Sequence, residues 1–75
     1  MSYEVIDARG LLCPLPVIKA QNKAKQLQPG DTLEIICTDP GAQHDIPAWC
    51  RIHGHKVIEI QQDEESDDFS VIVEI

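Results

Sequence analysis

The chain has 75 residues, of which 43% are hydrophobic and 25% charged, so we expect residues 1–75 to form a single domain with a modest core. Thirteen acidic residues against six basic ones give a formal charge of −7, which disfavours direct nucleic-acid binding, since that binding depends on basic side chains. No apolar run approaches membrane length and the N-terminal stretch lacks a signal-peptide pattern, so we expect a cytoplasmic protein without membrane contacts.

The first predicted strand covers residues 3–8, where the side chains alternate between the two faces of a strand. Residues 16–27 follow a helical pattern, because apolar side chains recur there at steps of three and four. Cys13 lies between the two elements, and Pro14 after it suits the first helical position, where the N–H that proline lacks would have no partner. The residues expected to fix the direction of the Cys13 thiol are Gly10, Pro14 and Pro16.

A thiol at the start of a helix meets unpaired backbone N–H groups and the positive end of the helix dipole. Both stabilise the thiolate, so the position of Cys13 predicts a lowered thiol pKa and a nucleophilic sulfur. Two interpretations of Arg9 stay open. Its positive charge either helps to hold a thiolate or persulfide at Cys13, or it pairs in solvent with Asp7 at the end of the strand.

Residues 32–37 are rich in β-branched side chains and predict a second strand, parallel to the first through a right-handed crossover. Asp39 is a suitable N-cap for a second helix, with Pro40 at its first position. Pro47 interrupts the pattern of that helix. Either the helix bends there, or a first turn ends and Asp45 caps a new helix.

Residues 55–61 and 69–75 both alternate and flank an acidic turn at residues 63–68, which predicts an antiparallel hairpin. The element order is therefore βαβαββ. This order predicts an α+β fold, a two-layer sandwich in which two helices cover one face of a four-stranded mixed sheet.

Cys37 is interpreted as a buried or edge thiol without chemistry, and Cys50 as a core residue on a helical face. Trp49 is interpreted as a packing residue or, if exposed, as an anchor for a partner. An odd number of cysteines without a Cys-x-x-Cys pair argues against a disulfide scaffold. The residues that could ligate a metal lack the close paired spacings of structural zinc sites, so we expect neither metal nor cofactor. They are His44, Cys50, His53 and His55.

The residues around Cys13 also carry a family resemblance. The pattern Cys-Pro-x-Pro, preceded by Asp-x-x-Gly-Leu, is similar to the signature of the TusA/SirA-like sulfur-carrier family. The resemblance extends over residues 7–57. Its further segments are Pro29-Gly30-Asp31, Asp39-Pro40, residues 45–50 and Gly54-His55.

The resemblance implies a sulfurtransferase-type carrier in which Cys13 holds sulfane sulfur as a covalent persulfide. The implied partners are a cysteine desulfurase as donor and a sulfur-accepting relay protein as acceptor. The usual endpoint is 2-thiouridine at the wobble position of tRNA, and carriers of this kind are expected to be monomers without a cofactor.

Two departures from the family pattern bear on the identity of these partners. Leu15 stands between the two prolines, where some relatives have an acidic residue, and Leu12 stands where a basic residue is often found. Two other functions therefore stay open. One is a sister carrier in thiosulfate or other sulfur-compound metabolism, and the other is a redox or regulatory binding module without transfer chemistry.

Overall fold

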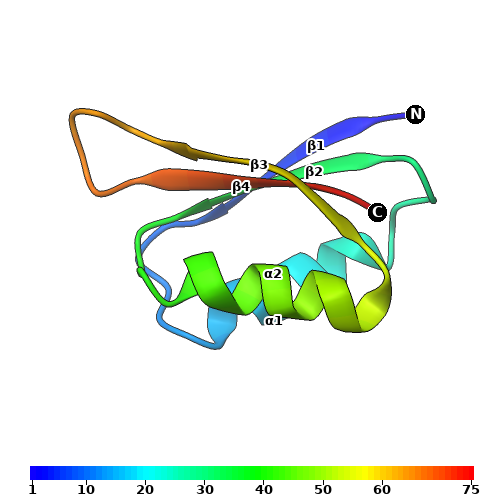
Figure 1. The fold of residues 1–75 in the computed structure, drawn as a ribbon, viewed down its shortest axis with the longest axis horizontal. Helices are drawn as coiled ribbons and strands as arrows, with labels where there is room; N and C mark the ends of the chain where they lie inside the picture. The colour runs from blue at the N-terminus through cyan, green and yellow to red at the C-terminus, as the bar shows by residue number, and fades with distance from the viewer.

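The computed structural model describes residues 1–75 and contains two helices and four strands (Figure 1). In chain order they are β1 (Tyr3–Ala8), α1 (Leu15–Ala24), β2 (Thr32–Cys37), α2 (Ala42–His53), β3 (Lys56–Gln62) and β4 (Phe69–Glu74). The predicted order βαβαββ and the α+β class are confirmed.

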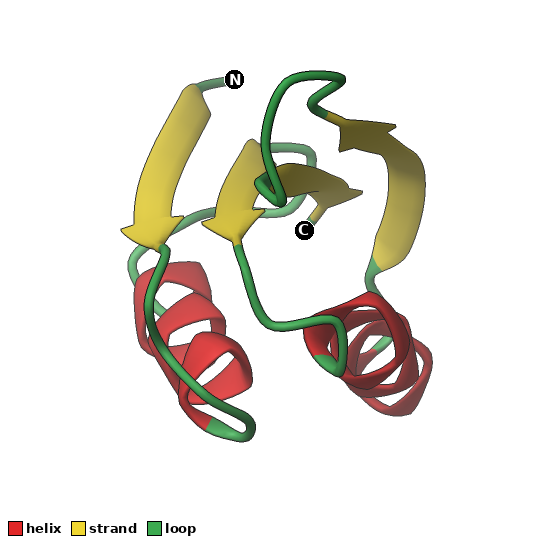
Figure 2. Ribbon diagram, turned by 90° about the vertical axis from the view of Figure 1, so that its left-hand side faces the viewer, coloured by secondary structure: helices red, strands yellow, loops and turns green.

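The strands form one mixed sheet. β1 and β2 run parallel, as expected for strands joined through a helix, whereas β4 is antiparallel to both β2 and β3. The order across the sheet is β1-β2-β4-β3, so the last strand of the chain lies inside the sheet. Both helices cover the same face of this sheet (Figure 2). The fold is therefore a two-layer sandwich, with a helical face and an open face.

The core lies between the sheet and the helices. Along β2, residues alternate strictly between half-buried and buried. Successive side chains of a strand point to opposite faces of the sheet, so this alternation is expected where the helices cover one face. The fully buried core side chains include Leu33 and Ile35 from the sheet and Ile46 from α2. Cys37, Trp49 and Cys50 belong to the same cluster, as predicted.

The observed helix boundaries differ from the predicted ones. α1 begins at Leu15 and ends at Ala24, and the Leu27 N–H donates to the Ala24 carbonyl in a turn after the helix, at 3.1 Å. Asp39 is not the N-cap of α2, because that position is held by Gly41, whose N–H donates to the Asp39 carboxylate at 3.5 Å. Neither helix combines the length and the apolar character needed to span a membrane.

α2 continues through Pro47 as a single helix, so the alternative in which Asp45 caps a new helix is wrong. A proline inside a helix removes one N–H donor. The buried side chains on either side of it, Ile46 and Trp49, hold the helix against the sheet and offset that loss.

Candidate functional site

Cys13 is the only exposed cysteine, since Cys37 and Cys50 are buried. It lies in the loop between β1 and α1. The parallel pairing of β1 and β2 places Ala8 opposite Cys37, so the two strands end at the same edge of the sheet. The loops that follow them therefore lie side by side, and the loop of Cys13 meets the loop that leads into α2.

Two hydrogen bonds join these loops. The Gly10 N–H donates to the Thr38 hydroxyl at 2.9 Å, and the Cys13 N–H donates to the Asp39 carboxylate at 2.8 Å. Gly10 has a φ of 78°, a left-handed conformation that favours glycine. The backbone at Gly41 approaches closely, because a Cβ there would lie 3.7 Å from the Cβ of Cys13. Both loops together fix the position of Cys13.

The thiol of Cys13 itself donates a hydrogen bond to the carboxylate of Asp45, in the first half of α2. This contact raises the pKa of Cys13 above its ordinary value, because the bonded carboxylate favours the protonated sulfur. Desolvation and the negative charges of Asp45 and Asp39 act in the same direction. The predicted lowering of the Cys13 pKa is therefore wrong for this structure.

The start of α1 also offers the thiol few donors. Pro14, at the N-cap, and Pro16 have no N–H, and the Leu15 N–H donates to the Leu12 carbonyl at 2.8 Å. The prediction treated this helix start as a set of free N–H groups, but two prolines and a turn remove most of them. Two carboxylates remain near the sulfur: that of Asp39, in the loop before α2, and that of Asp45, in α2.

A shallow groove of about 350 Å³ opens beside the thiol, between α1 and α2. Its lining residues are Cys13, Pro14, Val17, Asp45, Ala48, Trp49 and Ile52. Ile52, which lines the groove, is 77% exposed, and the apolar side chains of Leu12 and Leu15, on either side of Cys13 in the sequence, are 69% and 48% exposed. The reactive group thus lies at an apolar surface whose one charged lining residue is an aspartate.

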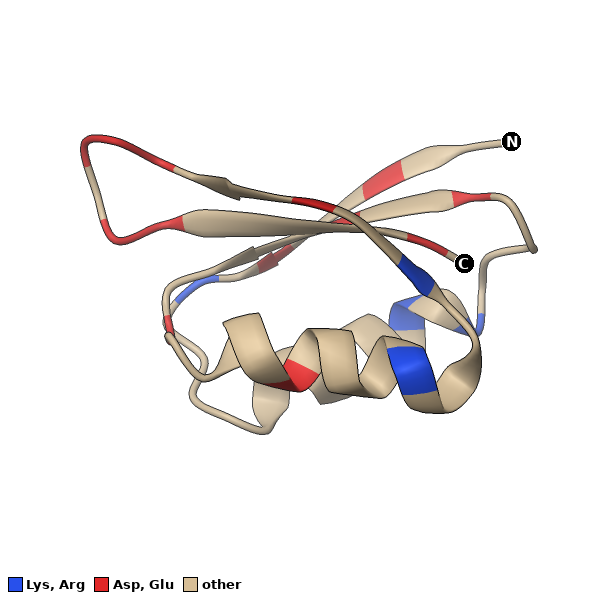
Figure 3. Ribbon diagram, viewed as in Figure 1, with Lys and Arg blue, Asp and Glu red and all other residues tan.

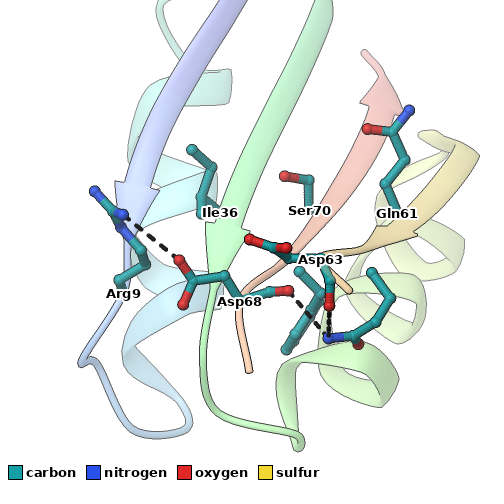
Figure 4. Close-up of a pocket in the computed structure, with 8 residues that line it drawn as sticks. Arg9, Ile36, Gln61, Asp63, Asp68 and Ser70 are labelled. Atoms are coloured by element: carbon teal, nitrogen blue, oxygen red, sulfur yellow. Dashed lines mark hydrogen bonds and ion pairs between the residues drawn. The ribbon is translucent and has the colours of Figure 1, made fainter. Parts of the chain in front are cut away.

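Arg9 is engaged elsewhere. Its Nε lies 2.9 Å from Oδ1 of Asp7, and its Nη1 lies 3.5 Å from Oδ2 of Asp68 in the turn between β3 and β4 (Figure 4). Asp7 in turn has its pKa lowered to about 2, chiefly by its hydrogen bond from Arg9. A role for Arg9 at the Cys13 sulfur would require it to leave these partners.

The four candidate metal ligands do not form a common cluster. Cys50 is buried in the core, whereas His53 and His55 flank Trp49 with ring centroids 6.1 and 4.8 Å from it. Burial lowers the pKa of His55, which favours the neutral ring. These rings form a packed aromatic group at the C-terminal end of α2.

Sequence reasoning missed Thr38, Asp39 and Asp45 as neighbours of Cys13. Asp39 was interpreted as a helix cap and Asp45 as a second possible cap. The signal that could have found them is topological, since two parallel neighbouring strands place the loops after them at one edge of the sheet. Applied to residues 9–14 and 38–41, this rule brings the two loops together.

Comparisons with known proteins agree with one another. A family model described as "Sulfurtransferase TusA" matches residues 4–75. The sulfur carrier protein TusA of Pseudomonas paraeruginosa is 44% identical over 59 residues, covering 79% of this chain and 75% of the relative. A Neisseria meningitidis protein provisionally named a sulfur carrier is 38% identical over 74 residues, covering 99% and 97%. The SirA-like protein of Desulfitobacterium hafniense has the same fold, with a TM-score of 0.83 at 21% identity over 95% of each chain.

Proposed function

Because this chain belongs to the TusA sulfurtransferase family, we propose that residues 1–75 act as a single sulfur-carrier domain with Cys13 as its carrier thiol. Cys13 accepts sulfane sulfur from a cysteine desulfurase and passes it to a sulfur-accepting relay protein. The proposal places this relay in the cytoplasm and gives the carrier a monomeric state.

The observation that carries the proposal is the contrast among the three thiols. Cys13 is exposed at a groove between the helices, whereas burial raises the pKa of both Cys37 and Cys50 to about 11. A carrier must present its sulfur to two successive proteins, and only an exposed thiol meets that requirement. The buried thiols also supply no accessible resolving cysteine, which favours sulfur transfer over dithiol redox chemistry.

Loading is a displacement at sulfur. The Cys13 thiolate attacks the terminal sulfur of the donor's persulfide, a new S–S bond forms at Cys13, and the bond to the donor's cysteine breaks. The bonding electrons leave with the donor's cysteine as a thiolate, so the exchange involves no net oxidation. The proton lost by the Cys13 thiol is matched by the one that the donor thiolate takes up. Unloading repeats the step with an acceptor thiol as the nucleophile.

Apolar side chains beside Cys13, among them Val17 and Trp49, offer a partner a docking surface next to the thiol. The proposed transfer is an exchange between thiols and persulfides, so the proposal itself involves no cofactor or metal. Gly10, Pro14 and Pro16 serve this site as supports. Gly10 makes the turn whose N–H bonds to Thr38, Pro14 lines the groove, and Pro16 is buried in the first turn of α1.

We propose tRNA 2-thiouridine as the endpoint, and a gene-deletion strain tests it. Loss of 2-thiouridine from bulk tRNA, restored by the wild-type gene and not by Cys13→Ser, is the expected result. Unchanged 2-thiouridine together with a defect in growth on thiosulfate would instead support the sister carrier of sulfur-compound metabolism. A Cys13→Ser strain that behaves as wild type in both assays would support a binding module without transfer chemistry.

A further inference from the structure

Two carboxylates face the sulfur of Cys13, and neither has a positive partner. Asp45 accepts the thiol hydrogen bond and Asp39 accepts the Cys13 N–H, yet neither forms a salt bridge. α1 contributes only uncharged residues to the groove, Pro14 and Val17. The site is therefore negative on the side of α2 and neutral on the side of α1.

The basic side chains nearest to Cys13 in the sequence are occupied by other groups. Arg9 pairs with Asp7 and Asp68, Lys19 donates to the carbonyl of Asp7, and Lys23 lies 3.2 Å from Glu4. Acidic residues also outnumber basic ones over the chain as a whole (Figure 3). Arg51, on the same helix as Asp45, forms no salt bridge with it. No basic side chain of the free protein therefore pairs with Asp45, and its carboxylate is available to a cation on a partner.

We propose that the groove between α1 and α2 docks the protein that donates sulfur to Cys13, and that this donor places a lysine or arginine on Asp45 and apolar side chains between the helices. The inference rests on the proposed function. It adds the chemistry of the partner surface and gives Asp45 two roles, holding the Cys13 proton in the free carrier and binding the partner's cation in the complex.

The two roles have a common electrostatic basis. In the free carrier, the uncompensated carboxylate of Asp45 opposes a second negative charge on the sulfur. A cation bound to Asp45 removes this opposition, so the Cys13 thiol releases its proton to solvent when the partner is docked. The net charge of −7 steers a basic surface toward the carrier.

The experiment compares Asp45→Asn with Asp67→Asn, which removes the same charge from the exposed turn between β3 and β4. Each variant also carries Cys37→Ser and Cys50→Ser, so that all reactivity belongs to Cys13. Alkylation by iodoacetamide, a small neutral reagent, reports on the free thiol. Persulfide loading by a cysteine desulfurase and cysteine reports on the docked one. Asp45→Glu, which keeps the charge, serves as the conservative variant.

The inference predicts opposite changes in the two rates. Asp45→Asn is alkylated about three- to fivefold faster near neutral pH, because it lacks the carboxylate charge that disfavours the thiolate. The effect is modest because solvent screens that charge. It is loaded about tenfold more slowly, since it lacks the anchor for the partner's cation. Asp67→Asn matches the parent in both assays, Asp45→Glu recovers most of the loading rate, and added salt slows loading of the parent more than of Asp45→Asn.

Loading of Asp45→Asn at or above the parent rate would overturn the inference and leave the proposed function standing. A parallel fall in both rates would also overturn it, because it would assign Asp45 a purely structural role. Absence of sulfur on the parent protein would overturn the proposed function, and this inference with it.

Discussion

The carboxylate of Asp45 accepts a hydrogen bond from the thiol of Cys13, although the two residues are 32 positions apart in the chain. The chemistry of the exposed thiol therefore depends on α2 as much as on the start of α1. The contact holds the sulfur in its protonated form. A thiol with a higher pKa is also the stronger nucleophile once its proton is lost, which suits the sulfur exchange proposed for Cys13.

The native protein should react with alkylating reagents at one cysteine. At about pH 8, a buried thiol with a pKa of about 11 is deprotonated in roughly one molecule in a thousand, and burial also blocks the reagent. We expect iodoacetamide to modify Cys13 alone in buffer and all three cysteines in guanidinium chloride, as read by peptide mass spectrometry. Modification of Cys37 or Cys50 at the rate of Cys13 in the native protein would contradict this.

The pH dependence of Cys13 alkylation should show which of the two neighbouring carboxylates, Asp45 or Asp39, raises the pKa of the thiol more. In a variant with Cys37→Ser and Cys50→Ser, the alkylation rate should rise with pH through a midpoint above that of a free cysteine peptide, because the pKa is raised. Asp45→Asn should move the midpoint down further than Asp39→Asn, since Asp45 acts through both a hydrogen bond and its charge, whereas Asp39 acts on the sulfur through charge alone. Equal shifts would show that the hydrogen bond adds nothing.

Substitutions on the face of the sheet that the helices cover should lower the unfolding free energy far more than substitutions on the open face. Leu33→Ala removes a fully buried side chain and should cost about 2–5 kcal/mol of unfolding free energy, as large-to-small core changes do. Ile58, which is 51% exposed at the bulge of β3, is the matched control, and Ile58→Ala should stay within about 0.5 kcal/mol. Urea unfolding followed by circular dichroism measures both, and similar losses would contradict the assigned core.

Acid should weaken the fold through Asp31. This carboxylate accepts backbone hydrogen bonds from Ser2 at 3.0 Å and Gln28 at 2.8 Å, which lower its pKa. A carboxyl whose pKa is lower in the folded state stabilises the fold above its unfolded pKa, and that stabilisation disappears as pH falls through its folded pKa. The urea midpoint of wild type should therefore drop between neutral pH and about pH 3 by more than that of Asp31→Asn.

Asp67→Asn, a charge removal in the exposed β3–β4 turn, is the control for Asp31→Asn and should follow the pH dependence of wild type. If Asp31→Asn and wild type lost the same stability in acid, the hydrogen bonds of Asp31 would have no part in the pH dependence.

The sequence predicted the elements well because each strand and helix carries its own local pattern. A run rich in β-branched side chains located Thr32–Cys37, and proline and glycine marked the turns. The place of β4 inside the sheet was not predicted, because alternation says which face is buried and not which strands are neighbours. Val71, Ile72 and Val73 are consecutive apolar residues, and such a run indicates a strand buried on both faces rather than its place in the sheet.

At the candidate site, local reasoning located Cys13 and misjudged its electrostatics. The helix start was treated in isolation, and there the expected effect on the thiol is activation. The structure adds Asp39 and Asp45 from segments 26 and 32 residues away, and such contacts follow from strand pairing, which no local pattern encodes. Arg9 was left with two interpretations, and the structure pairs it with Asp7 and Asp68.

The central claim is that Cys13 carries the sulfur, and the site of loading tests it most directly. The protein is incubated with a cysteine desulfurase and cysteine, the remaining thiols are blocked, and the peptides are examined by mass spectrometry. The account predicts one added sulfur atom on the peptide of Cys13, its removal by a thiol reductant, and no added sulfur in Cys13→Ser. Added sulfur on Cys37 or Cys50 with Cys13 unmodified would contradict the account.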